Sequence, residues 1–449
     1  MPKLFGTDGI RGEAYRPPLD RSTVIRVGQA LAKELPADAP RILIGRDTRA
    51  SGPDIESWLT AGILAAGGRP TSAGVTPTPA IAFLTQRESF DAGVVISASH
   101  NPFRDNGIKI FSADGVKSSE ALENAIENEV NSSSELGHVP EATPSPSLSL
   151  EKLYSDHLAA SLGDVRLPKL KIALDCANGA GYRVGPKLLA SVGLDVVALF
   201  DEPNGENINR DCGSTAMAHL TEAVVDSACD LGAALDGDGD RVLFVNSKGN
   251  FVDGDAILLL CARRLKKEGR LSGDAVVATV MSNMALEVAL ADAGITLLRT
   301  QVGDKFVAHE MAQRHIVVGG EQSGHIIFSD YASTGDGLLT LMQVLRVVAL
   351  EQRSFDELSH VDPFPQVLVN VRVRSQPDVR SVPEIARAIV NAEKKLAGRG
   401  RVLVRYSGTE PLLRIMMEGP EETEISSLTQ DIRAIVEASI GGGNGESPD

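Results

Sequence analysis

Three aspartates stand at alternate positions in the motif Asp236-Gly-Asp-Gly-Asp-Arg241. Carboxylates this close together repel one another unless a cation lies among them, and a set of oxygen ligands selects a hard ion such as Mg2+. The intervening glycines allow the backbone to turn tightly around such an ion. Apolar runs precede and follow the motif, so the acidic cluster interrupts a strand-like stretch. We therefore predict a divalent-metal site formed by Asp236, Asp238 and Asp240.

Two other interpretations of this motif are a solvated acidic turn and a calcium-binding EF-hand loop. An EF-hand loop needs glycine at its sixth position and glutamate at its twelfth. When Asp236 is counted as the first position, this chain has Arg241 and Ser247 there, which excludes the EF-hand. The solvated turn stays open, although packing alone gives a buried strand no reason to end in three carboxylates.

A serine lies at the end of the apolar run in Gly93-Val-Val-Ile-Ser-Ala-Ser-His-Asn-Pro102. The run predicts a buried strand, and the Asn-Pro pair predicts a turn after it. Ser99 lacks the Gly-x-Ser-x-Gly flanks of the α/β-hydrolases. If it is a nucleophile, a divalent ion and nearby positive charge would activate it, which suits phosphoryl transfer. The alternative is that Ser99, His100 and Asn101 only form the hydrogen bonds of the turn.

Two further loops carry polar groups of the kinds that bind sugars and phosphates. Gly319-Gly-Glu-Gln-Ser-Gly-His325 combines a carboxylate, a hydroxyl and an imidazole, which suits sugar hydroxyls or, equally, a polar turn between strands. Arg405-Tyr-Ser-Gly-Thr-Glu-Pro-Leu-Leu-Arg414 offers hydroxyls, backbone N–H groups and two guanidinium groups, the parts of a phosphate cradle. Its alternative is a helix start capped by Ser407 or Thr409. Arg11, on a glycine-rich loop, is a weak signal by itself.

Composition limits the classes of function. The net charge of −16 argues against nucleic-acid or anionic-membrane partners, since binding phosphate backbones needs a basic surface. The four cysteines are widely spaced, so neither a zinc site nor a redox dithiol is indicated, and a reduced cytoplasmic setting fits. The N-terminus has no apolar signal core, and no apolar run approaches the roughly 20 residues that span a bilayer. We expect a soluble, unprocessed protein.

The elements that position these loops follow a repeated pattern. An aliphatic strand, a turn, a helix that ends at glycine and a second strand recur in segments that begin at Arg41, Lys171 and Ala275. Together with 43% hydrophobic but only 4% aromatic residues, this predicts three related α/β units in series. Each unit is expected to have a largely parallel or mixed sheet covered by helices. A chain of 449 residues is long enough for about three or four domains.

After residue 365 the pattern changes to period-two alternation over 367–373, a helix over about 382–396 and a strand over 401–405. This predicts a smaller α+β domain. The stretch 131–149 is rich in Ser and Pro and predicts a surface connection, and the Gly-rich tail from residue 441 predicts disorder. The predicted domains are 1–152, 153–254, 255–365 and 366–440, followed by the tail 441–449.

Taken together, these segments resemble the α-D-phosphohexomutase superfamily over essentially the whole chain. The resemblance is carried by the motifs at 3–12, 97–102, 236–241 and 320–325. Gln322 and the segments 211–215 and 302–305 resemble the branch that acts on glucosamine phosphates more than the branch that acts on mannose and glucose phosphates. Ala216 departs from the former branch, which commonly has histidine there.

The resemblance implies four domains around a central cleft and an isomerase that interconverts glucosamine 6-phosphate and glucosamine 1-phosphate for amino-sugar and cell-wall precursor synthesis. Ser99 would be a phosphoserine, and a hexose or hexosamine 1,6-bisphosphate would be the intermediate and activator. The alternatives are mannose and glucose phosphates as substrates, a metal-dependent phosphatase, and a sugar-phosphate-binding scaffold. A homodimer is an expectation from the resemblance alone.

The resemblance also assigns roles to residues of this chain. Mg2+ would be held by the three aspartates and an oxygen of the serine phosphate. Arg11, His100, Lys109, Arg241 and His325 would be catalytic, with Lys109 and His325 as candidate general acid and base. Glu321 and Ser323 would bind the hydroxyls of the substrate. Its non-reacting phosphate would be bound by Arg405, Ser407, Gly408, Thr409 and Arg414.

Overall fold

The computed structural model describes residues 3–6, 8–132, 139, 141–142, 144–407 and 410–441. The chain forms two compact units. The first unit comprises Met1–Met281 and Gly294–His360, and the second comprises Ser282–Ala293 and Val361–Asp449. Most of the predicted tail, residues 442–449, lies outside the described residues, as do 133–138, 140 and 143 of the predicted connection.

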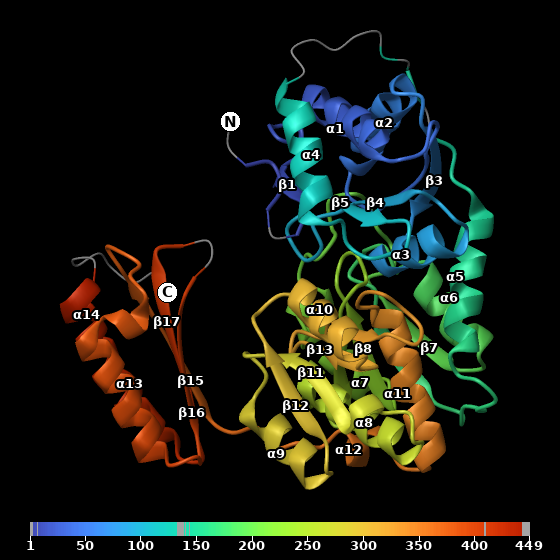
Figure 1. Cartoon of the computed structure of the whole chain (residues 1–449). Coiled ribbons are helices and arrows are strands. Elements are labelled where there is room, and N and C mark those ends of the chain that lie inside the picture. Colours follow the sequence, from blue (N-terminus) through green and yellow to red (C-terminus); the bar gives the residue numbers. More distant parts are fainter. Residues whose placement is uncertain are drawn as a thin grey trace. The chain divides into compact units, whose positions relative to one another are not determined.

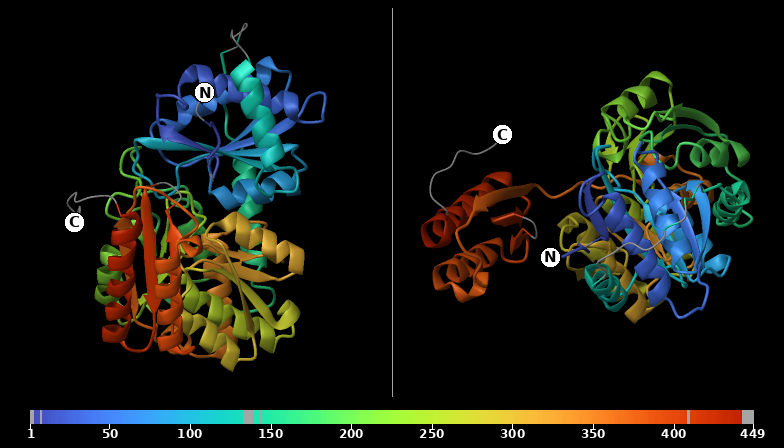
Figure 2. Two further views of the ribbon diagram at one scale, coloured as in Figure 1. Left: turned by 60° about the vertical axis from the view of Figure 1, so that its left-hand side comes forward. Right: turned by 90° about the horizontal axis from the view of Figure 1, so that it is seen from above.

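The first sheet of the large unit has the strand order β1-β5-β4-β2-β3. β2 is parallel to β3 and β4, and β5 is antiparallel to β4 and β1, so the sheet is mixed, as predicted. α1, α2 and α4 lie over one face and α3 under the other (Figures 1 and 2). The elements are β1 (Ile10–Glu13), α1 (Arg21–Glu34), β2 (Arg41–Arg46), α2 (Gly52–Ala65), β3 (Arg69–Val75), α3 (Thr78–Arg87), β4 (Ala92–Ile96), β5 (Asp105–Ser112) and α4 (Glu120–Ser132).

Two more mixed sheets follow, with the orders β10-β9-β8-β6-β7 and β12-β11-β13-β14. The second sheet belongs with β6 (Lys171–Asp175), α6 (Val184–Ser191), β7 (Asp195–Leu199), α7 (Ala218–Asp226), β8 (Leu231–Leu235), β9 (Val242–Asn246) and β10 (Phe251–Val252). The third belongs with α8 (Gly254–Lys267), β11 (Ala275–Thr279), β12 (Thr296–Thr300), α10 (Asp304–Arg314), β13 (Val318–Gly320), β14 (Ile326–Phe328), α11 (Gly337–Glu351) and α12 (Phe355–Leu358).

The three sheets share one topology, which confirms the predicted internal repeat. When the repeats are counted from β2, β6 and β11, the first strand of each lies between two parallel partners, and the third strand pairs with an antiparallel fourth strand. The first helix of each repeat ends before a glycine in the left-handed region, Gly67, Gly193 or Gly294, as the sequence predicts. The connection between the third and fourth strands therefore occupies an equivalent place in every repeat.

The small unit is an antiparallel sheet with two helices packed together on it, the α+β arrangement that the sequence predicts. The strand order is β15-β17-β16. α9 also belongs to this unit, where its N-cap Asn283 exchanges hydrogen bonds with the backbone of Phe364. The elements are α9 (Met284–Asp292), β15 (Gln366–Arg372), α13 (Pro383–Leu396), β16 (Arg401–Tyr406), β17 (Leu412–Glu418) and α14 (Glu422–Ile440).

Helix α5 (Leu148–Ala160) links all three repeats of the large unit. Its His157 stacks on Phe83 of α3, and its Glu151 pairs with Arg183 beside α6. Its Tyr154 donates a hydrogen bond of 2.9 Å to Asp336, the N-cap of α11. Burial raises the pKa of Asp336 to about 6. The other carboxylate oxygen of Asp336 accepts the N-cap hydrogen bond from the Leu339 N–H at 2.9 Å, so the buried phenol is the partner of Oδ2.

None of the helices within the described ranges combines the length and the apolar composition that crossing a bilayer requires. Cys176, Cys212, Cys229 and Cys261 are all free and buried.

Replacing Tyr154 by Phe should lower the free energy of unfolding of the large unit by about 1–3 kcal/mol, because Asp336 loses a buried donor. The urea midpoint of unfolding should fall with it. The raised pKa means that the contribution of Asp336 to stability is present below about pH 4, its unfolded pKa, and is lost as the pH rises through about 6. The hydroxyl supports the ionised form, so the midpoint difference between variant and wild type should be larger at pH 8 than at pH 5.

Tyr182→Phe is the matched control for this measurement. Tyr182 is half-buried, and its hydroxyl makes no hydrogen bond to the described residues, unlike that of Tyr154. Equal midpoints for wild type and Tyr154→Phe at both pH values would contradict the role given to this hydrogen bond.

Candidate active site

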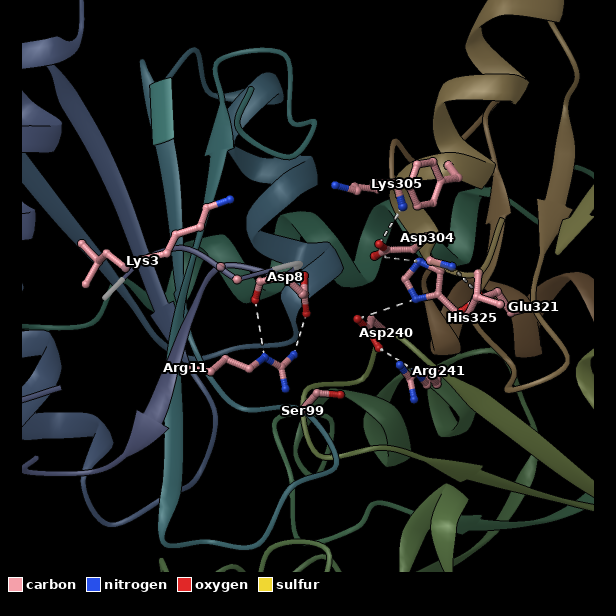
Figure 3. A pocket seen from close by; sticks show the side chains of 16 residues that line it. Lys3, Asp8, Arg11, Ser99, Asp240, Arg241, Asp304, Lys305, Glu321 and His325 are labelled. Carbon is pink, nitrogen blue, oxygen red and sulfur yellow. Dashed lines mark hydrogen bonds and ion pairs between the residues drawn. The ribbon is translucent and has the colours of Figure 1, made fainter. Parts of the chain in front are cut away.

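The three equivalent connections of the repeats meet at one place in the large unit. Ser99 lies between β4 and β5, the aspartate motif between β8 and β9, and His325 at the end of the connection between β13 and β14. The Ser99 hydroxyl donates a hydrogen bond of 2.5 Å to Asp236 Oδ2. His325 Nδ1 lies 3.7 Å from Asp240 Oδ2 (Figure 3). The fold thus brings together three predicted motifs that are far apart in the sequence.

The aspartate motif is buried, which rules out the solvated-turn interpretation. Asp236 and Asp238 are 1% exposed and Asp240 is 5% exposed. One potential ligand atom from each lies within 4.8 Å of the others. Burial and the two neighbouring carboxylates raise the pKa of Asp236 well above its ordinary value, a direct expression of their repulsion.

Two oxygens of this cluster mark where a cation fits. Asp238 Oδ1 and Asp240 Oδ1 are buried and accept no hydrogen bond among the described residues. Buried carboxylate oxygens are rarely left without a partner, because the desolvation of the charge is then uncompensated. A hard divalent cation with oxygen ligands would satisfy both atoms. The donor set of this chain therefore fits Mg2+.

Glycine is required at positions 237 and 239 of the motif for different physical reasons. Gly239 has φ +74°, so the turn needs a left-handed residue there. Gly237 is instead required by close approach, because a Cβ atom would lie 2.6 Å from the carbonyl oxygen of Ser99. The sequence interpretation that both glycines serve the turn is thus corrected: one of them lets the metal loop lie directly against the serine loop.

Lys109 offsets part of the negative charge. Its ammonium group is 2.9 Å from Asp238 Oδ2, 3.3 Å from Asp8 Oδ2 and 3.7 Å from Asp240 Oδ2. Burial opposes its protonation, but these carboxylates raise the pKa of Lys109 well above its ordinary value. Lys109 is therefore charged and acts here as a fixed counter-ion.

Arg241 and His100 lie close to each other beside the serine. The backbone N–H of Arg241 donates to Asp236 Oδ1 at 3.1 Å, and its Nη1 lies 3.4 Å from His100 Nδ1. His100 Nδ1 is also 3.4 Å from the Ser99 hydroxyl oxygen. Burial, together with the charges of Arg241 and Arg11, lowers the pKa of His100. A neutral imidazole therefore lies beside the serine.

The orientation of His325 defines its tautomer. Its side chain is 2% exposed, and the N–H of Gly335 donates to Nε2 at 3.1 Å. Nε2 then carries a lone pair, so the ring proton is assigned to Nδ1, which faces Asp240. Burial opposes protonation, but the carboxylates of Asp240 and Asp304 raise the pKa of His325 above its ordinary value.

A second set of charges was missed by sequence reasoning. Lys117 pairs with both Asp8 and Asp304, and Asp304 Oδ2 lies 3.7 Å from His325 Nε2. Asp8 also pairs with Arg11 at 2.6 Å. Although burial opposes its ionisation, the charges of Lys109, Lys117 and Arg11 hold the pKa of Asp8 far below its usual range. Asp8 and Asp304 lie inside motifs that the sequence singled out, whereas no pattern marked Lys117.

Beside Ser99 is a cavity of about 570 Å3 lined by both acidic and basic side chains (Figure 3). Glu321 lines it and accepts a hydrogen bond from the Gly303 N–H at 3.1 Å, so this loop is both a turn between strands and part of the cavity wall. Ser323 Oγ is buried and has no hydrogen-bond partner among the described residues. The charged lining residues are Lys3, Asp8, Arg11, Asp240, Arg241, Asp304, Lys305, Glu321 and His325.

The predicted phosphate cradle belongs to the small unit. Arg405 of β16 and Arg414 of β17 are directly opposite in the antiparallel register, and Arg414 Nη2 lies 3.5 Å from Ser407 Oγ. Burial and the neighbouring Arg414 lower the pKa of Arg405. The segment leads into a strand, so the helix-start alternative is wrong. Gly408 and Thr409 lie outside the described residues.

Family models match almost the whole chain, in four parts. They are described as phosphoglucomutase/phosphomannomutase alpha/beta/alpha domains I, II and III and the C-terminal domain. The matched residues are 2–137, 152–249, 253–364 and 368–435. This agrees with the predicted fold class of three related α/β domains and a smaller C-terminal domain.

Two curated relatives match this chain over nearly their whole length, and both are named phosphoglucosamine mutase. The chain is 46% identical to the phosphoglucosamine mutase of Syntrophotalea carbinolica over 98% of each chain. It is 46% identical to that of Solibacter usitatus over 98% of this chain and 99% of the relative. These identities extend through all four matched domains.

Solved structures share the fold at lower identity. A phosphoglucomutase/phosphomannomutase family protein from Burkholderia thailandensis has a TM-score of 0.80 at 22% identity, covering 97% of both chains. N-acetylphosphoglucosamine mutase from Aspergillus fumigatus, in complex with GlcNAc-6P and magnesium, has a TM-score of 0.67 at 19% identity, covering 97% of this chain and 95% of that one. A serine-to-alanine variant of the same protein, in complex with glucose 1,6-bisphosphate, has a TM-score of 0.61 at 19% identity and the same coverage.

Replacing Asp238 by Asn should weaken Mg2+ binding on the order of tenfold or more, because a charged ligand is replaced by a neutral one. Isothermal titration calorimetry with Mg2+ measures the change directly. Asp195→Asn, which alters an exposed aspartate at the start of β7, is the control and should leave the titration unchanged. Identical Mg2+ titrations for Asp238→Asn and wild type would remove Asp238 from the ligand set.

Proposed function

This chain belongs to the phosphoglucomutase/phosphomannomutase family, and we propose that it is the isomerase that interconverts glucosamine 6-phosphate and glucosamine 1-phosphate. The reaction class is inferred from the Ser99 hydroxyl, which lies 2.5 Å from a buried aspartate cluster with two oxygens that accept no hydrogen bond among the described residues. A serine in contact with a site for a divalent ion suits phosphoryl transfer. The choice of glucosamine rests on the name that the full-length relatives share.

Ser99 carries the transferred phosphoryl group in this proposal. In the first half-reaction, the P–O bond to Ser99 Oγ breaks as a hydroxyl oxygen of the sugar phosphate forms a new P–O bond. The sugar hydroxyl proton passes to a base, Ser99 Oγ takes up a proton as it leaves, and the product is a 1,6-bisphosphorylated sugar. After this sugar reorients, Ser99 Oγ gives up its proton and takes the other phosphoryl group, and the sugar oxygen that loses this group regains a proton. Phosphate is thereby moved between C6 and C1 with no net consumption of bisphosphate.

Asp236, Asp238 and Asp240 would hold Mg2+ together with an oxygen of the serine phosphate. When bound, the ion would supply positive charge against the developing charge of the transferring phosphoryl group. Ser99 in its unmodified form donates its proton to Asp236 Oδ2. Phosphorylation removes that proton, which frees an oxygen of Asp236 and supports a metal affinity that depends on the state of the serine.

The remaining groups have roles that follow from their charge. Lys109 is a fixed cation among three carboxylates, so it neutralises charge and leaves His325 as the proton carrier. Arg11, Arg241 and the neutral His100 orient the phosphoryl group at Ser99. Glu321 and Ser323 bind the hydroxyls of the substrate. Its non-reacting phosphate is bound by Arg405, Ser407, Gly408, Thr409 and Arg414.

A trace of hexose or hexosamine 1,6-bisphosphate is needed in this scheme, because it phosphorylates Ser99 before the first turnover. The four free, buried cysteines are compatible with a reducing compartment, so we place the reaction in the cytoplasm.

The enzyme should convert glucosamine 6-phosphate with a higher kcat/KM than glucose 6-phosphate or mannose 6-phosphate. The assay contains Mg2+ and a catalytic amount of glucose 1,6-bisphosphate, and 31P NMR follows the appearance of each 1-phosphate. An equal or reversed preference would reject glucosamine as the substrate while leaving the family assignment in place.

Replacing Ser99 by Ala should abolish both turnover and labelling, since no oxygen remains to accept the phosphoryl group. Incubation with glucose 1,6-bisphosphate and Mg2+ should add one phosphoryl group to the wild type, measured by intact-protein mass spectrometry, and none to the variant. Ser191→Ala, at the end of α6, should behave as wild type. Normal turnover by Ser99→Ala would exclude the phosphoserine mechanism.

A further inference from the structure

Arg49 is a fully buried arginine that packs against the loop carrying Ser99. Arg49 is 0% exposed and pairs through Nε with Asp47 Oδ2 at 2.8 Å. Its other four N–H groups donate to backbone carbonyl oxygens of the loop that carries Ser99. These acceptors are the carbonyls of Ser99 at 2.9 Å, Asn101 at 2.8 Å, Asp105 at 2.9 Å and Pro102. All five donors of the guanidinium are therefore used within one loop and one carboxylate.

The backbone of Ser99 is held on both sides by this group. Its carbonyl accepts from Arg49, and its N–H donates to Ser97 Oγ at 2.9 Å. The Ser97 hydroxyl in turn donates to Asp47 Oδ2 at 2.5 Å. Ser99 has φ +52°, in the left-handed region that a non-glycine residue occupies only when its surroundings impose it. Arg49, Asp47 and Ser97 contribute to that constraint from the first repeat, and Asn209 Nδ2 adds hydrogen bonds of 2.9 Å to the Ser99 carbonyl and 3.1 Å to the Asn101 carbonyl.

A comparison of the three repeats shows which feature of the Asp47–Arg49 turn is common to the fold and which occurs only beside Ser99. At the end of the first strand of each repeat, a side-chain oxygen accepts the N–H two residues later: Asp47 from Arg49, Asp175 from Ala177 and Thr279 from Met281. The turn is thus common to all three repeats. The residue that donates is an arginine in the first repeat but alanine or methionine in the other two. Arginine accompanies the loop that carries the serine.

We infer that Arg49 is a positioning residue for phosphoryl transfer, which it serves by holding the backbone of Ser99 in the left-handed conformation that directs Oγ toward Asp236. The inference rests on the proposed function. Asp47 neutralises the charge of Arg49, so the contribution is geometric rather than electrostatic. Lysine cannot replace it, because three donors on one nitrogen do not reach four carbonyls spread around a planar fork.

The test measures the chemical step separately from substrate binding. Arg49→Lys is phosphorylated with labelled glucose 1,6-bisphosphate, isolated and mixed with glucosamine 1-phosphate, and the loss of label is followed in a single turnover. We expect the transfer rate and kcat to fall about 100-fold, as a small misplacement of a reacting group does, with KM within about threefold of wild type. Arg264→Lys is the matched control, since Arg264 also makes several ion pairs, but with Glu268 and Glu351. It should transfer at the wild-type rate.

A second pair of variants decides the question if Arg49→Lys does not fold. Ser97→Ala removes the acceptor of the Ser99 N–H and should slow transfer on the order of tenfold, whereas Ser97→Thr keeps a hydroxyl and should restore most of the rate. Transfer within threefold of wild type in a folded Arg49→Lys, or equal rates for Ser97→Ala and Ser97→Thr, would overturn the inference. An inactive wild type would instead reject the proposed function.

Discussion

The repulsion among Asp236, Asp238 and Asp240 is the constraint on which the rest of the site depends. Three buried carboxylates are stable only with compensating charge and hydrogen bonds. Lys109, the Ser99 hydroxyl and the Arg241 N–H compensate part of it. Two oxygens that accept no hydrogen bond among the described residues remain, and they fit a divalent cation. The same imbalance that would destabilise an ordinary core thus creates a place that suits a divalent cation.

The internal repeat explains how three distant loops reach that cluster. Ser99, the aspartate motif and His325 all lie in the connection between the third and fourth strands of their own repeats. Parallel strands end at the same edge of a sheet, so each repeat presents this connection at an equivalent edge. One topology, used three times, therefore accounts for the meeting of the loop that carries Ser99, the aspartate motif and the loop that ends at His325.

Sequence reasoning identified the loops but not the contacts that hold them. The three-domain repeat, the C-terminal α+β domain and the functional motifs could be predicted, because apolar periodicity and residue spacing are local. Arg49, Lys117 and Asp304 were missed, since their importance comes from contacts with residues outside their own sequence segments, such as Asp105 for Arg49 and Lys117 for Asp304. The purpose of Gly237 was also misread, because close approach to Ser99 is a property of two separate segments.

By itself, the sequence determined which chemical groups are available: three carboxylates two residues apart, a serine at a strand end, and loops with the groups that bind sugars and phosphates. Only the tertiary structure decided that the serine hydroxyl contacts Asp236, that Lys109 is held charged, and that His325 presents its Nδ1 proton to Asp240. The physical reason is that charge and hydrogen-bond partners are set by distance and burial. These arise from the packing of three sheets, which no single segment encodes.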